Sequence, residues 1–90
     1  MRPIACAAAV VITVITPPQR YDYPFTGRVI VKKDALEYCP RGDWACAHVG
    51  GDGNGICVVH MWRGLKNKDY ERLMRHEVAH CNGWATDHPK

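Results

Sequence analysis

The sequence predicts a small α+β domain in which a short antiparallel sheet packs on one C-terminal helix and disulfides staple the two together. Three observations lead to this prediction. Two apolar runs flank a glycine-rich loop, which is typical of a β-hairpin. One long segment near the C-terminus has the apolar spacing of an amphipathic helix. Four of the five cysteines lie between residues 39 and 81, a density typical of small stapled domains.

Composition narrows the class of protein further. A chain of 90 residues with 47% hydrophobic and 23% charged residues is expected to form one globular domain. The net charge of +3 is small and scattered, which argues against nucleic acid as a partner. No run of 18 apolar residues is present, so a conventional membrane-spanning helix is not expected. We expect a monomer.

The N-terminus has the order of a targeting segment. Arg2 precedes the apolar run Ile4–Ile15, and Pro17 and Pro18 follow it. We predict a signal peptide or N-terminal anchor over residues 1–18 and the folded domain over residues 19–90, so that any membrane contact is made through the first segment. A first strand of the domain is the alternative, because the run is rich in β-branched residues. Removal of the segment would take Cys6 with it and leave four cysteines.

The middle of the chain divides into short elements. Arg28–Lys33 has the β-branched content of a strand, and Asp34–Tyr38 fits a helical turn that its first residue caps. Trp44–Val49 and Ile56–Trp62 are the two strands of the predicted hairpin. We interpret Ile56–Trp62 as a candidate edge strand that pairs with an extended peptide substrate.

The long periodic segment runs from Asn67 to Asn82, and Gly83 stands where a helix-terminating glycine belongs. It carries His76-Glu77-Val78-Ala79-His80. Histidines four residues apart share one helix face, so both imidazoles can bind one zinc ion. The glutamate beside the first histidine can take a proton from water that the metal acidifies. Asp87 or His88 can complete the metal site.

These residues resemble a known group of enzymes. His76-Glu77-x-x-His80-x-x-Gly83 resembles the zinc signature of metzincin metallopeptidases, which have the zincin fold. The stretch from residue 75 to residue 88 is similar to small metallopeptidases of bacteria, their phages and plasmids, strongly over 73–88 and loosely over 25–57. In metzincins the third ligand falls at the position of Thr86. We therefore favour His88 as third ligand, with Asp87 as its substitute or as a supporting partner.

The remaining cysteines fit disulfides better than a zinc site, because they include no C-x-x-C pair. Four cysteines allow three connectivities. We prefer the one that pairs Cys39 with Cys46, closing a small loop, and Cys57 with Cys81, tying the hairpin to the metal helix. Disulfides in turn predict a periplasmic or secreted protein.

Other aromatic and histidine residues have lesser predicted roles. His60 is interpreted as a structural strand histidine, with stabilisation of an oxyanion as its functional alternative, and His48 as structural or surface. Trp84 can form a wall of the zinc pocket.

We therefore predict a zinc metallopeptidase that acts on a peptide or protein substrate, with Glu77 as general base. The alternatives are a zinc-binding interaction module without turnover and a disulfide-stapled interaction domain without metal.

Overall fold

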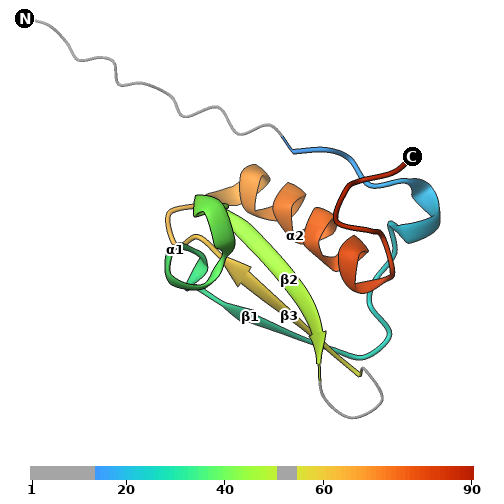
Figure 1. Ribbon diagram of the computed structural model, residues 1–90, viewed down its shortest axis with the longest axis horizontal. Coiled ribbons are helices and arrows are strands. Elements are labelled where there is room, and N and C mark those ends of the chain that lie inside the picture. Colours follow the sequence, from blue (N-terminus) through green and yellow to red (C-terminus); the bar gives the residue numbers. More distant parts are fainter. Residues whose placement is uncertain (1–13, 51–54) are drawn as a thin grey trace, which may run out of the picture.

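Three strands form one mixed sheet against which the C-terminal helix packs (Figure 1). A computed structural model describes residues 14–50 and 55–90. In it the strands β1 (Arg28–Lys32), β2 (Ala45–Gly50) and β3 (Ile56–Met61) lie in the order β1-β3-β2. The predicted hairpin is confirmed, because β2 and β3 pair antiparallel with Cys46 opposite His60.

The position of β3 corrects one prediction. Ile56–Trp62 was expected at an edge of the sheet, but β3 is the central strand and has a neighbour on both sides. β1 pairs with it in parallel, with Val29 opposite Cys57. The backbone groups of β3 are therefore used within the sheet, and the edges that remain are those of β1 and β2.

The core lies between β3 and helix α2 (Asn67–Cys81), which follows the predicted range closely. Cys57, Val59 and Met61 of β3 are fully buried. Because strand side chains alternate, these three share one face, and they cluster with Leu73 of α2 and Ala45 of β2. The opposite face of β3 carries His60, toward helix α1 (Ala35–Tyr38).

Asp34 differs from its predicted role. It stands at the N-cap position of α1, but its side chain makes no capping hydrogen bond. Its carboxylate instead accepts a hydrogen bond from the His60 ring, 26 residues away in sequence. A short helix of one turn gains little from a cap, whereas a buried imidazole needs a partner.

Two disulfides have the preferred connectivity. Cys39 bonds to Cys46, joining the end of α1 and the following 3₁₀ turn η2 (Pro40–Gly42) to β2. Cys57 bonds to Cys81, joining the central strand to the last residue of α2. Both bonds therefore connect an element of the sheet to a helix.

The segment before β1 lies along α2 (Figure 1). Val14 packs against the core, and Pro17 is buried. After the 3₁₀ turn η1 (Gln19–Tyr21), Asp22 forms an ion pair with Arg75 of α2. The predicted targeting segment falls mostly on residues 1–13, outside the described residues, but residues 14–18 contact the domain. Across 14–50 and 55–90, no helix has the length and apolar character needed to span a membrane.

Replacing Cys57 and Cys81 together with alanine is expected to destabilise the protein more than replacing Cys39 and Cys46. The disulfides close loops with sequence separations of 24 and 7 residues. The chain-entropy model then gives about 3.5 kcal/mol for the longer loop and about 2.5 kcal/mol for the shorter. Urea unfolding followed by circular dichroism measures both values. An equal or smaller loss for the Cys57–Cys81 pair would contradict the importance we assign to the β3–α2 connection.

Candidate metal centre

Three histidines from the C-terminal quarter of the chain converge on one point. His76 and His80 lie one turn apart on α2, so their rings share a face of the helix. Gly83 ends the helix with φ +107°, a conformation that favours glycine. The chain then turns back through a hydrogen bond from the His88 amide to the Ala85 carbonyl. His88 itself has φ +59°, an uncommon conformation for a residue with a side chain, and its ring meets the other two.

The three imidazole rings point their Nε2 atoms toward one another. The Nε2 atoms of His76 and His88 are 3.1 Å apart, and each of these atoms lies 3.2 Å from Nε2 of His80. Two nitrogen ligands of a tetrahedral zinc ion are about 3.3 Å apart, given Zn–N bonds of about 2.0 Å. The three residues therefore form a group that can hold a metal ion.

The other ring nitrogens determine which tautomer the ligands adopt. His76 Nδ1 lies 2.8 Å from the Ile15 carbonyl oxygen, and His80 Nδ1 lies 2.7 Å from the Trp84 carbonyl oxygen. A carbonyl only accepts, so each Nδ1 carries the proton and each Nε2 of a neutral ring has a free lone pair. Two lone pairs 3.2 Å apart repel unless a cation lies between them. The arrangement thus fits a metal ion better than it fits bare imidazoles.

Burial keeps these rings in the neutral form that metals bind. Desolvation lowers the pKa of His76 and of His80, and the nearby histidines lower them further. Trp84, which is 2% exposed, stacks on the His80 ring at 4.8 Å and meets the rings of His76 and His88 edge-on. Trp84 is not among the residues that line the cavity over the site, so its role as a wall of the zinc pocket stays a prediction. Asp87, the alternative ligand, is exposed and is not part of the group.

Glu77 lies beside the histidines in a low-dielectric position. It is 5% exposed, and burial raises its pKa to about 7, with a smaller contribution from the negative charge of Asp43. A carboxyl group with a pKa near neutrality can both accept and donate a proton at physiological pH.

A cavity of about 710 Å³ opens over the site between α2 and β2. Its lining includes Glu77, the three histidines and the β2 side of the sheet from Trp44 to His48. His60 does not line it. Its ring lies between Asp34 and His48 on the far side of the sheet, so the structure does not bring it to the three histidines as an oxyanion donor.

Two supporting groups could not be identified from the sequence. The Ile15 carbonyl belongs to the backbone, and it reaches His76 from 61 residues away. His48 gave no signal beyond its residue type, although it lies at the cavity and contacts His60.

Comparison with known proteins assigns no family, since no family model, curated protein or solved structure matches the chain. The chemistry therefore rests on the geometry described above.

Removing the segment that supports His76 is expected to weaken metal binding. A protein that begins at Gln19 lacks the Ile15 carbonyl, whereas one that begins at Val14 retains it. Loss of such a supporting hydrogen bond typically costs about 10–100-fold in metal affinity. Competition with a chelator measures the affinity of both proteins. Equal affinities would show that His76 is oriented without this contact.

The buried Glu77 predicts a pH dependence in metal-free protein. Its pKa is raised from 4.5 to about 7 on folding, so its contribution to stability is present below pH 4.5 and is lost as the pH rises through 7. Glu77→Gln has no such loss. The stability of the variant relative to wild type should therefore increase over this range, by on the order of 3 kcal/mol. Urea unfolding of both proteins across this pH range, with chelator present, measures the difference, and a constant difference would contradict the buried carboxyl.

Proposed function

We propose that the chain is a zinc-dependent peptidase that hydrolyses peptide bonds outside the cytoplasm. The observation that supports this most strongly is the convergence of three histidine Nε2 atoms beside a buried glutamate in an open cavity. Among the described residues, the group that could hold a metal ion consists of three histidines. Catalytic zinc sites use three protein ligands, whereas structural zinc sites use four.

Each member of the proposed site has a distinct task. His76, His80 and His88 would hold the ion through Nε2. A zinc ion in this position supplies Lewis-acid chemistry, which polarises a carbonyl group and lowers the pKa of water. Glu77 accepts the proton of the attacking water and returns it to the leaving amine.

The edge of β2 is the best candidate for binding the substrate. Among residues 14–50 and 55–90, β2 has a neighbour on one side only, and its residues line the cavity beside Glu77. An extended peptide can therefore add to this edge through backbone hydrogen bonds, with its scissile bond over the histidines. This role replaces the one predicted for Ile56–Trp62, whose strand is central.

Two disulfides are consistent with an oxidising compartment. We propose that the N-terminal segment directs the chain there, as a signal peptide or as an anchor. Because residues 14–18 contact the domain and the site, a cleavage before residue 14 agrees better with these contacts than a cleavage after residue 18.

One observation favours the rival function, a zinc-binding module without turnover. His60, whose alternative role was oxyanion stabilisation, does not line the cavity, and peptide hydrolysis benefits from a donor aimed at the developing oxyanion. The two functions share the metal and differ only in hydrolysis.

Glu77→Gln separates these functions. We expect the variant to retain the zinc ion held by the three α2-side histidines and its circular dichroism spectrum, and to lose at least about 100-fold in hydrolysis, the usual contribution of a general base. Mass spectrometry of a broad peptide library detects cleavage. Glu71→Gln, at an exposed position of the same helix, is the matched control and should keep full activity.

The outcomes of this comparison are distinct. If zinc-loaded wild-type protein cleaves no peptide, the module without turnover is favoured. If Glu77→Gln and Glu71→Gln are equally active, Glu77 is not the base. In the same assays His88→Ala should weaken zinc binding at the group of three histidines while Asp87→Ala leaves it unchanged, and the reverse result would make Asp87 the third ligand.

A further inference from the structure

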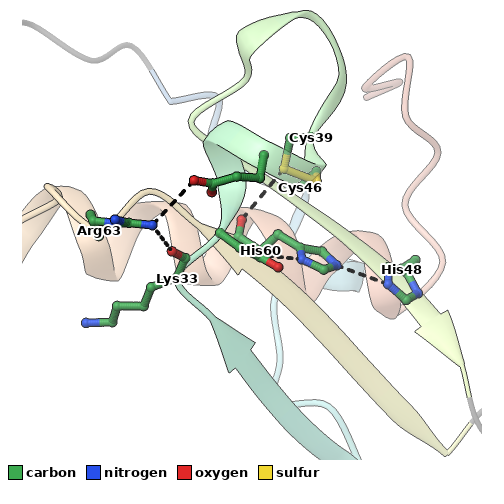
Figure 2. Close-up of polar contacts among 8 residues, drawn as sticks. Lys33, Cys39, Cys46, His48, His60 and Arg63 are labelled. Carbon is green, nitrogen blue, oxygen red and sulfur yellow. Dashed lines mark hydrogen bonds and ion pairs between the residues drawn. A yellow bond between two sulfur atoms is a disulfide. The ribbon is translucent and has the colours of Figure 1, made fainter.

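A second polar cluster lies on the face of the sheet opposite α2. Figure 2 shows the His60 and His48 rings end to end along β3 and β2. His60 Nδ1 lies 2.7 Å from Asp34 Oδ1, and His60 Nε2 lies 3.1 Å from His48 Nε2. The Tyr38 ring stacks on the His60 ring at 3.6 Å with an interplanar angle of 8°.

The fold holds these residues firmly in place. Cys46 is the cross-strand partner of His60, so His48, two residues further along β2, is its diagonal neighbour on the same face. The Cys39–Cys46 disulfide fixes the end of α1 to β2, and this brings Tyr38 over the rings. Asp34 lies directly before α1 and reaches the buried side of His60, which is 2% exposed.

The hydrogen bond from His60 to Asp34 determines where the free nitrogen of His60 points. A carboxylate accepts the Nδ1 proton, so the Nε2 lone pair of His60 is directed at His48. Metal-ligating histidines commonly donate their second ring proton to a carboxylate in this way. The 3.1 Å between the two Nε2 atoms equals the shortest such distance in the first cluster. All five histidines of the chain thus belong to one of two converging groups.

We propose that His48 and His60 form a second divalent metal site, separate from the one on α2, in which Asp34 orients His60. His48 is exposed at the edge of β2, so an ion can enter from solvent and keep water or a solute in its remaining coordination positions. Two imidazoles select an ion that prefers nitrogen, such as Zn²⁺ or Cu²⁺, and Cu²⁺ binds such ligands more tightly. Asp34 offsets part of the ion's charge.

Binding at this site requires a proton to move within His48. Without an ion, His48 donates its Nε2 proton to the His60 lone pair, which accounts for their contact. With an ion, both Nε2 atoms are ligands, and the His48 proton lies on Nδ1. This change of tautomer distinguishes a metal site from a hydrogen-bonded chain of Asp34, His60 and His48.

Counting bound ions tests the proposal. Equilibrium dialysis against Zn²⁺, followed by elemental analysis, should give two ions per oxidised wild-type chain. His48→Ala should bind one ion, and the double variant His80→Ala/His88→Ala, which leaves a single histidine of the first group, should bind one ion because it keeps the second site. Asp34→Asn should weaken the second site by about 10–100-fold and leave the first unchanged. The test is independent of peptidase activity, because each site is counted in a variant that removes the other.

The tautomer provides a second measurement. On titration with Zn²⁺, the ¹⁵N signals of His48 and His60 in His80→Ala/His88→Ala should move to the positions of metal-bound Nε2, with His48 protonated at Nδ1. A single ion per wild-type chain, two ions in His48→Ala, or unchanged His48 and His60 signals would each overturn the second site. Retained circular dichroism in His48→Ala, whose side chain is exposed, shows that the count reports binding and not unfolding.

Discussion

The attachment of α2 to the central strand is the interaction on which the rest of the structure depends. Met61 and Val59 of β3 are buried against this helix, and Cys57 is bonded covalently to its last residue. A domain of this size buries a small core, so a covalent link compensates for apolar area that the chain lacks. The link lies one residue after His80, and it therefore holds the turn of α2 that carries His76 and His80 against the sheet.

Local sequence patterns predicted the parts of the molecule that local forces determine. The apolar spacing of α2, the glycine-rich hairpin and the histidine pair one turn apart each depend on neighbouring residues, and each is confirmed. Errors arose where pairing is long-range. Nothing near Arg28–Lys32 indicates a parallel partner, and the central position of β3 follows from that pairing. Likewise, Asp34 has the residue type of a helix cap, and only the folded chain brings His60 to it.

The two histidine groups use the same geometry with different supporting partners. On α2 the second nitrogens donate to backbone carbonyls, which are neutral, so burial dominates and keeps His76 and His80 uncharged. The partner of His60 is the carboxylate of Asp34, which accepts the Nδ1 hydrogen bond and fixes the orientation of the ring. An ion held by the first group would therefore supply Lewis-acid chemistry, whereas Asp34 would offset part of the charge of an ion held by the second. Our proposals accordingly place catalysis at α2 and binding at the opposite face.

β2 connects the two groups, because its side chains alternate between them. Ala45 and Ala47 face α2 and leave room for the cavity, while Cys46 and His48 face α1. His48 lies at the unpaired edge and lines the cavity as well, so a peptide strand added there would contact both sides of the sheet. Bulky side chains in place of the two alanines would fill the space above Glu77. β2 thus connects the proposed substrate-binding edge with both proposed metal sites. Its small residues lie on the face toward α2, and His48 lies on the other face.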